Sequence, residues 1–308
     1  MPKNGNTRVR FLGGYAAQPD LLGVLSYPVA LDEHEVEFTR FIMTNQQKWV
    51  QMPFELDIVS LTFTDSSHGK AWWLLGKRGQ VISFNSAGRT EELISDAGTG
   101  PEKLGYVTSM RLIGGQLFAC GYRRQIYERT AGSWQHRDAG ILADKATRGV
   151  SLNDLEGGPT GAICAIGNHG EIAMQSGADW TMLDSPTNQH LYAICVDDSG
   201  MFNAVGANGT VIRGDESGFE VVCSENPGQA GALWDIECFQ GDLIASASAG
   251  LFLIKNGSLQ PFSPAPPATM VGYKLTSNAA RLWSVGTHQI YCFDGNEWQE
   301  WVCPDNAP

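Results

Sequence analysis

The sequence contains neither a long apolar run nor a regular helical pattern. No stretch approaches the roughly 18 consecutive apolar residues that cross a bilayer. The N-terminal MPKNGNTRVRFLGG lacks the apolar segment of about 7 to 15 residues found in secretory signals. No window keeps apolar residues at i, i+3, i+4 and i+7 between helix caps. We therefore expect a cytoplasmic protein with little helix and no membrane partner.

Pairs and clusters of metal-binding residues are also missing. The seven cysteines are odd in number, form no CxxC pair and lie mostly in apolar stretches. This pattern is typical of small buried hydrophobic residues in a reducing compartment. The six histidines show none of the HxH, HxxxH or HExxH spacings of metal sites. The sequence therefore predicts no metal and no cofactor.

Motifs for nucleophilic catalysis and for nucleotide binding are absent as well. There is no GxSxG and no GxxxxGK[ST], and the glycine-rich turns lie between strands instead of opening a helix. The formal net charge of -12 opposes non-specific binding to nucleic acid and favours attraction to basic partners. We assign no catalytic residue and do not expect nucleic acid as the partner.

What the sequence does contain is a repeat, clearest in residues 200–222, GMFNAVGANGTVIRGDESGFEVV. The apolar runs FNAVG and TVIR favour two buried strands. Between them Ala207-Asn208-Gly209 supplies a turn in which positive φ is tolerated, and Phe219 opens an outer strand. Weaker copies recur along most of the chain, so this unit predicts one blade of a larger array.

Each copy is anchored by the first glycine of its turn. The clear anchors are Gly76, Gly121, Gly167, Gly206 and Gly286, and Ala247 takes the anchor position in ASASAGLFLIK. Successive anchors lie 39 to 46 residues apart, which is the spacing of four-stranded propeller blades. A degenerate first unit, about residues 8–55, has lost its turn glycines and is located by Trp49.

Counting the first unit gives seven blades, with six or eight as alternatives. We predict an all-β protein, a β-propeller of four-stranded antiparallel blades in a single domain over residues 1–308, monomeric when unbound. The segment RVRFLGGY either supplies the inner strand of the first unit or pairs with the last unit. Closure of the ring matters because it removes exposed strand edges.

The units with G-x-x-G, a return strand and a following aromatic residue resemble two kinds of repeat. AVGANGTVIRGDESGFEVV and AIGNHGEIAMQSGADWTML are similar to the repeats of photosystem II assembly-factor-like and bacterial neuraminidase-repeat propellers, over roughly residues 60–302. The resemblance implies a propeller. The Asp box of neuraminidases, S-x-D-x-G-x-T-W, is eroded in every copy, for example in QSGADW and GDESGF, so the resemblance does not imply glycosidase activity.

Two sets of residues are candidates for partner binding. The turns after the anchors should gather on one face, and they carry Lys77, Arg78, Tyr122, Arg123, Arg124, His169 and His288. Their cations predict either a basic patch for an acidic loop or phosphate group, or ordinary solvated turns. Aromatic residues near the starts of the inner strands are Tyr106, Tyr192, Trp234 and Tyr273. They predict either an aromatic collar that anchors a partner or packing between blades.

These features favour a non-catalytic propeller that presents a rigid face to another protein. Charge, compartment and missing motifs favour a bacterial immunity protein that binds and blocks a toxin. An assembly factor or scaffold is the alternative. A third hypothesis is a propeller hydrolase or lyase with a site at the channel mouth, built from inner-strand residues: Asp57, Asn153, Asp154, His190 and Asp235.

Overall fold

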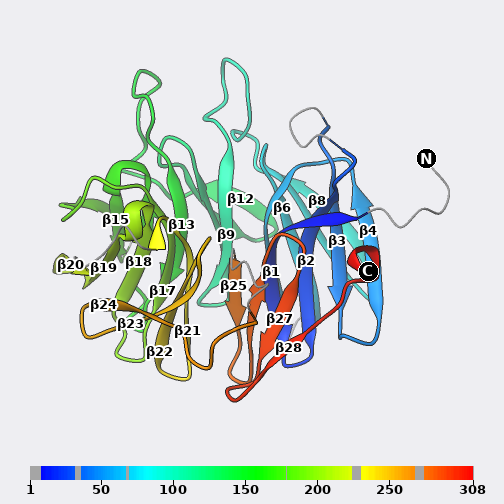
Figure 1. Ribbon diagram of the computed structural model, residues 1–308. Coiled ribbons are helices and arrows are strands. Elements are labelled where there is room, and N and C mark those ends of the chain that lie inside the picture. The colour runs from blue at the N-terminus through cyan, green and yellow to red at the C-terminus, as the bar shows by residue number, and fades with distance from the viewer. Residues whose placement is uncertain are drawn as a thin grey trace.

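The chain folds into seven four-stranded antiparallel sheets arranged as a ring (Figure 1). The computed structural model describes residues 8–31, 36–66, 69–177, 179–223, 230–267 and 274–307. The first strand of each sheet contacts the first strands of both neighbouring sheets, from β1 round to β25 and back to β1. The predicted fold, an all-β propeller with seven blades, is confirmed.

Each blade runs outward from its inner strand in chain order. Blade 1 comprises β1 (Val9–Gln18), β2 (Leu21–Pro28), β3 (Thr39–Thr44) and β4 (Trp49–Phe54); blade 2 comprises β5 (Ile58–Ser66), β6 (Gly69–Gly76), β7 (Gln80–Asn85) and β8 (Gly88–Leu93). Blade 3 comprises β9 (Val107–Ile113), β10 (Gln116–Gly121), β11 (Ile126–Thr130) and β12 (Ser133–His136); blade 4 comprises β13 (Leu152–Gly157), β14 (Ile163–Gly167), β15 (Ile172–Ser176) and β16 (Asp179–Leu183).

The remaining blades follow the same order. Blade 5 comprises β17 (Leu191–Val196), β18 (Phe202–Gly206), β19 (Val211–Asp215) and β20 (Gly218–Cys223); blade 6 comprises β21 (Leu233–Phe239), β22 (Asp242–Ala247), β23 (Gly250–Lys255) and β24 (Ser258–Pro261). Blade 7 comprises β25 (Lys274–Ser277), β26 (Leu282–Val285), β27 (Ile290–Phe293) and β28 (Trp298–Glu300). Short 3-10 turns are η1 (Asn168–Gly170), η2 (Ala207–Gly209) and η3 (Pro304–Asn306). Within the described residues, no helix has the length and apolar character needed to cross a bilayer.

The hydrophobic core lies between neighbouring blades. Phe118 and Cys120 of β10, for example, pack with Ile163 and Ala165 of β14 in one buried cluster. Middle strands are covered on both faces by adjacent blades, which explains why FNAVG and similar segments are continuous apolar runs and do not alternate. Cysteines contribute to this core: all seven are free thiols, and six of them are buried, as the sequence predicts.

The ring is closed by contacts between the two ends of the chain. β1 is the inner strand of blade 1 and also packs on β25 of blade 7, where the Ala16 amide donates to Thr276 Oγ1 at 2.9 Å. The Val9 amide donates to Asn306 Oδ1 at 2.9 Å. Each blade is made from one continuous stretch of chain, so side chains and backbone amides join the ends without exchange of a strand.

In blades 2 to 5 the anchor turn lies against the connection that enters the inner strand of its own blade. The Tyr122 amide donates to the Tyr106 carbonyl at 2.9 Å, and the Ala207 amide donates to the His190 carbonyl at 2.8 Å. A Cβ added at Gly206 would lie 1.9 Å from the His190 oxygen. The anchor glycine is therefore required by close approach of two backbones. We call the face that carries these turns and connections the anchor-turn face.

Candidate partner-binding face and channel

A β-bulge near the start of the inner strand recurs in six of the seven blades. One residue of the inner strand has no partner in the neighbouring strand: Leu12, Val59, Thr108, Asn153, Tyr192 or Trp234. All except Trp234 line the cavity inside the ring, which has a volume of about 290 Å³. Because a bulge redirects the side chain of its extra residue, these positions form the rim of the channel on the anchor-turn face.

Three of the bulge residues also link neighbouring blades, from blade 3 to blade 6. Thr108 Oγ1 donates to the Leu152 carbonyl at 2.7 Å, and Asn153 Nδ2 donates to the Leu191 carbonyl, also at 2.7 Å. Tyr192 stacks on Trp234 with ring centroids 5.2 Å apart and planes 19° apart. These contacts join blades 3 to 6 along the rim, through small polar side chains between blades 3 and 5 and through aromatic rings between blades 5 and 6.

The structure divides the aromatic set that the sequence indicated. Tyr192 and Trp234 are together on the rim, but Tyr106 lies just before β9 and forms an edge-to-face pair with Tyr122 at 5.8 Å. The Lys77 ammonium lies 5.5 Å from the centre of the Tyr106 ring. Tyr273 lies outside the described residues. The collar expected from four aromatics thus has two described members in contact and a third in a separate group.

Cations of the anchor turns are mostly engaged within the protein. Lys77 pairs with Asp57 of the connection beside it, Arg78 pairs with Glu37, and Arg124 Nε and Nη2 contact Glu171 Oε1 at 2.9 and 2.5 Å. Arg123 Nη2 donates to the Ala143 carbonyl at 2.6 Å. The turns gather on one face as expected, but three of the four cations are neutralised by carboxylates, so the positive charge shown there is smaller than the sequence indicated.

The two predicted histidines lie in different places. The rings of His169 and His190 are 4.7 Å apart, and the His169 amide donates to His190 Nδ1 at 3.2 Å. His288 is at the junction of blades 7 and 1, where its Nδ1 donates to the Val9 carbonyl at 2.9 Å. The candidate binding residues therefore surround the anchor-turn face in several groups and do not form a single cluster.

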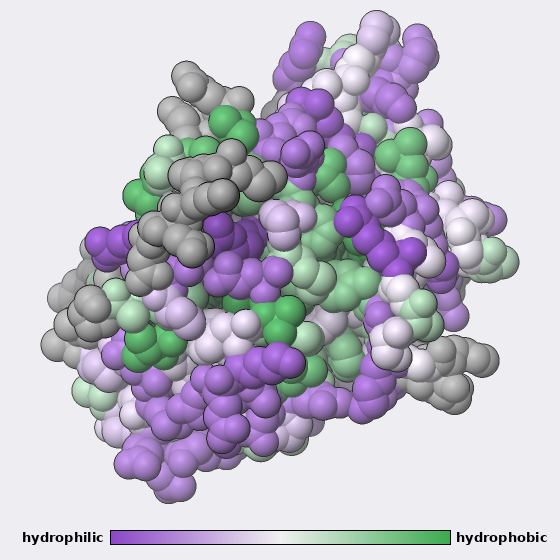
Figure 2. Space-filling model, turned by 90° about the vertical axis from the view of Figure 1, so that its right-hand side faces the viewer, coloured by the Kyte–Doolittle hydropathy of each residue, from purple (hydrophilic) through white to green (hydrophobic). Residues whose placement is uncertain are grey.

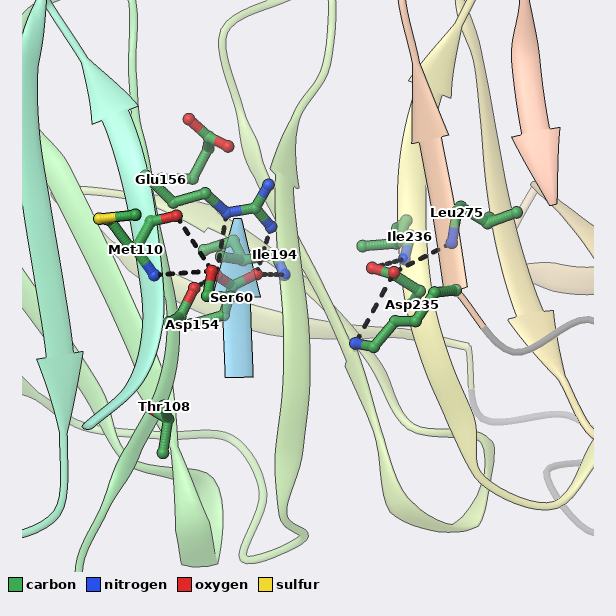
Figure 3. Close-up of polar contacts among 12 residues, drawn as sticks. Ser60, Thr108, Met110, Asp154, Glu156, Ile194, Asp235, Ile236 and Leu275 are labelled. Carbon is green, nitrogen blue, oxygen red and sulfur yellow. Dashed lines mark hydrogen bonds and ion pairs between the residues drawn. The ribbon is translucent and has the colours of Figure 1, made fainter. Parts of the chain in front are cut away.

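Deeper in the channel, one ion pair joins blades 3 and 4 (Figure 3). Arg111 Nε lies 3.0 Å from Asp154 Oδ1, and Arg111 Nη2 lies 2.6 Å from Asp154 Oδ2. Ser109 Oγ also donates to Asp154 Oδ1, at 2.8 Å. Burial alone would raise the pKa of Asp154, but the charge and hydrogen bonds of Arg111 outweigh it and hold that pKa below its ordinary value.

A second carboxylate, Asp235, joins blades 6 and 7 in an equivalent way (Figure 3). Its Oδ2 accepts the Leu275 amide at 3.0 Å and lies 3.7 Å from Lys274 Nζ. Glu237, two residues along the same strand, accepts a hydrogen bond from Ser277 Oγ at 2.7 Å. Burial, opposed by that hydrogen bond and reinforced by the charge of Asp235, raises the pKa of Glu237 to about 7.

Sequence reasoning missed two cations and two acidic residues of the channel: Arg111, Lys274, Glu156 and Glu237. A signal was present for the acids, because NDLE in β13 and WDIE in β21 place Asp and Glu two residues apart on the same side of equivalent strands. Arg111 and Lys274 could not be located in this way, since each lies on a strand that lacks the repeated acidic pair.

The residues suggested for a catalytic or metal site are used elsewhere. Asp57 pairs with Lys77, Asn153 bridges to blade 5, and Asp154 and Asp235 hold neighbouring inner strands. No group of three or more His, Cys, Asp or Glu residues placed to hold a metal ion occurs in the described part of the chain.

The outer side of the ring offers no comparable arrangement. Figure 2 shows the side that carries the outer strands of blades 1 and 2, where hydrophilic residues cover most of the surface and hydrophobic residues show between them. Leu93 at the end of β8 is the most exposed large apolar side chain described, at 60%. Isolated apolar side chains are ordinary on protein surfaces, so the anchor-turn face remains the better candidate for binding.

Comparison with known proteins gives one relative in sequence and several in fold. The chain is 30% identical over 250 residues to immune protein Tsi7 of Pseudomonas aeruginosa, a match that covers 80% of each chain. No family model matches the chain.

Solved structures similar to this one are also propellers. YCF48 bound to D1 peptide superposes with a TM-score of 0.66 at 14% identity, over 96% of this chain and 94% of the other. YCF48 from Cyanidioschyzon merolae gives 0.64 at 13%, over 99% and 98% of the two chains. The WD40 propeller domain of Doa1 gives 0.65 at 13%, over 96% and 95%. At these identities the likeness concerns the fold alone, and it confirms the resemblance to assembly-factor-like propellers at that level.

Proposed function

The chain belongs to the family of immune protein Tsi7, and we propose that it is an immunity protein that binds a toxin and blocks it. The observation that carries this proposal is the match to Tsi7 at 30% identity over 80% of both chains. The same role follows as a hypothesis from the sequence, on the grounds of charge, compartment and missing catalytic motifs. Family membership now supports it independently.

The architecture supports a binding role because the anchor-turn face is ordered before any partner arrives. Backbone hydrogen bonds of 2.8 to 2.9 Å tie anchor turns to the connections beside them in blades 2 to 5. Binding to such a surface costs little conformational entropy, so a larger share of the contact energy becomes affinity. A rigid face is also suited to covering the active site of another protein.

The proposal places the partner on the anchor-turn face and the protein in the cytoplasm. Seven free cysteines are consistent with a reducing compartment. The net charge of -12 favours association with a toxin whose exposed surface is basic. The aromatic pair Tyr192 and Trp234 on the channel rim supplies contact area of the kind that dominates interface energies.

Neither the assembly-factor role nor the hydrolase or lyase hypothesis gains support of its own. The likeness to YCF48 at 13 to 14% identity carries the fold alone and not an assembly role. A hydrolase or lyase at the channel mouth would need free carboxylates, but Asp154 and Asp235 are occupied by bonds between blades.

The experiment is protection of cells from the toxin. The toxin is sought by co-purification from the native host and among the genes next to this one, and it is then expressed with and without this protein. The proposal predicts that growth is restored and that the two proteins elute together as one complex. Continued toxicity, with this protein folded and in excess, would contradict the proposal.

A further inference from the structure

A cleft of about 710 Å³ opens on the anchor-turn face beside blade 3. Its base is the anchor turn of that blade, and its walls are the two long connections before β9 and β13, residues 94–106 and 137–151. Backbone hydrogen bonds hold the turn to both walls: the Tyr122 amide donates to the Tyr106 carbonyl at 2.9 Å, and the Arg123 amide donates to the Val150 carbonyl at 3.0 Å. The cleft is therefore a preformed feature of the fold.

Positively charged side chains line this cleft, and none of its lining residues is acidic. The cations are Lys103, Arg123, Lys145 and Arg148. Arg148 is exposed and makes no ion pair with any described residue, and Arg123 Nε is buried without a hydrogen-bond partner in the described structure. An unpaired buried donor of this kind costs free energy.

Nearby carboxylates neutralise the cleft only in part. Glu102 lies 3.4 Å from Lys145 Nζ, but its side chain is 92% exposed. Asp144 Oδ1 accepts the Ala146 amide at 2.7 Å, and this carboxylate also interacts electrostatically with Arg123. Lys103 Nζ donates to the Ser95 carbonyl, which carries no formal charge, and Lys145 Nζ donates to the Pro101 carbonyl besides its contact with Glu102. On a chain with a net charge of -12 this is a local positive site.

The base of the cleft departs from the repeat in a way that costs stability. Arg123 and Arg124 have φ of 60° and 63°. The position of Arg124 is glycine with positive φ in other blades: Gly79, Gly170, Gly209 and Gly250. A left-handed conformation costs a non-glycine residue about 1–2 kcal/mol. Strain of this kind tends to be kept at functional sites, and here it is found at Arg123, which lines the cleft, and at Arg124 beside it.

We infer that this basic cleft receives an acidic segment of the toxin, a surface loop that carries Asp or Glu. The inference rests on the proposed function and adds which part of the partner is recognised. Carboxylates would pair with Arg148 and Lys145, while the Tyr122 ring, 45% exposed, covers the segment from one side. Because the chain as a whole has a net charge of -12, the cleft would contribute more to the orientation of the toxin in the complex than to the overall electrostatic attraction.

The sharpest variant is Arg148→Glu, since the exposed Arg148 side chain makes no hydrogen bond or ion pair with the described residues that the substitution would break. Affinity for the purified toxin is measured by calorimetry at two salt concentrations. We expect at least tenfold weaker binding for Arg148→Glu, about a hundredfold for Lys145→Glu/Arg148→Glu, and a smaller salt dependence for both. Replacement of an acidic residue of the toxin loop by Lys should partly restore binding of Arg148→Glu.

Lys48→Glu and Lys255→Glu are matched controls, because both side chains are exposed on the opposite face, Lys48 in the turn between β3 and β4 and Lys255 at the end of β23. They should bind as the wild type does. Equal affinity of wild type and Arg148→Glu would overturn the cleft proposal and leave the immunity role intact, whereas absence of toxin binding by the wild type would overturn both. Loss of affinity for duplex DNA in Arg148→Glu, without change in toxin binding, would assign the cleft to nucleic acid and overturn the proposal.

Discussion

Arg111 of blade 3 and Asp154 of blade 4 form a two-pronged ion pair in the wall of the central channel, with N–O distances of 3.0 and 2.6 Å. The same carboxylate lies 3.4 Å from the Ile194 amide of blade 5. One aspartate therefore joins the inner strands of three blades. Since the blades are held together mainly by apolar packing, this polar contact fixes how they are oriented around the channel.

Asp154→Ala should destabilise the protein by about 3 kcal/mol, because it leaves the Arg111 guanidinium in the channel without its carboxylate. Chemical unfolding measures this loss. The double variant Arg111→Ala/Asp154→Ala should lose less than the sum of the two single variants. Asp65→Ala removes an exposed pair with Lys70, both more than half exposed, and should leave the unfolding midpoint unchanged. Equal effects of Asp154→Ala and Asp65→Ala would argue against a bracing role.

Glu237 should make stability depend on pH. Its folded pKa of about 7 lies above the ordinary value of 4.5, so the folded state keeps a proton that the unfolded state has released. Stability due to this group is therefore fully present below pH 4.5, declines as pH rises from 4.5 to about 7, and is lost above that. Glu237→Gln should flatten the profile and be more stable than the wild type at pH 8, by about 1–3 kcal/mol.

Ser277→Ala is the matched control for Glu237, because the Ser277 hydroxyl donates to this carboxylate and lowers its pKa. Its loss should move the decline in stability to higher pH without abolishing it. Identical pH profiles for the wild type and Glu237→Gln would show that Glu237 titrates as an ordinary glutamate.

The architecture could be predicted from sequence because local chemistry imposes it. Gly206 and its equivalents are required where two backbones meet, so the repeat is visible as glycines at blade spacing. The starts of the inner strands follow from the same anchors. The bulges could not be predicted, since Thr108, Asn153 and Tyr192 share a position in the fold but no chemical character.

Charge on the binding face was harder to predict. The sequence shows Lys77, Arg78 and Arg124 as cations of neighbouring anchor turns. Their carboxylate partners come from other segments of the chain, such as Glu37 for Arg78 and Glu171 for Arg124. The basic cleft was missed because the sequence does not show which cations the fold brings together. Its cations Lys103, Lys145 and Arg148 lie in connections without a repeat pattern, and only the fold brings them together.

Arg124→Gly and Arg124→Ala should differ even though both remove the ion pair with Glu171. Glycine adopts the left-handed backbone conformation of this position without strain, whereas alanine remains strained in it. We expect Arg124→Gly to be more stable than Arg124→Ala by about 1 kcal/mol in urea unfolding. If the two variants unfold at the same urea concentration, the turn is not strained by its arginine.

Tyr192→Ala/Trp234→Ala tests whether the aromatic pair on the rim binds the partner or only joins blades 5 and 6. We expect at least a tenfold loss of toxin affinity in a protein that still folds, because large aromatic side chains dominate interface energies. Leu93→Ala, which trims an exposed apolar side chain on the outer strand β8, should bind normally. If the double variant binds the toxin with unchanged affinity, Tyr192 and Trp234 serve only to pack blades 5 and 6 together.

Titration of the purified wild-type protein with the purified toxin, followed by calorimetry, tests the central claim most directly. Binding by the preordered anchor-turn face predicts a one-to-one complex with a Kd on the order of nanomolar. Affinity should fall for Tyr192→Ala/Trp234→Ala and for Arg148→Glu but not for Lys255→Glu. No heat of binding from a folded protein and an active toxin, or a complex insensitive to every change on that face, would contradict the account.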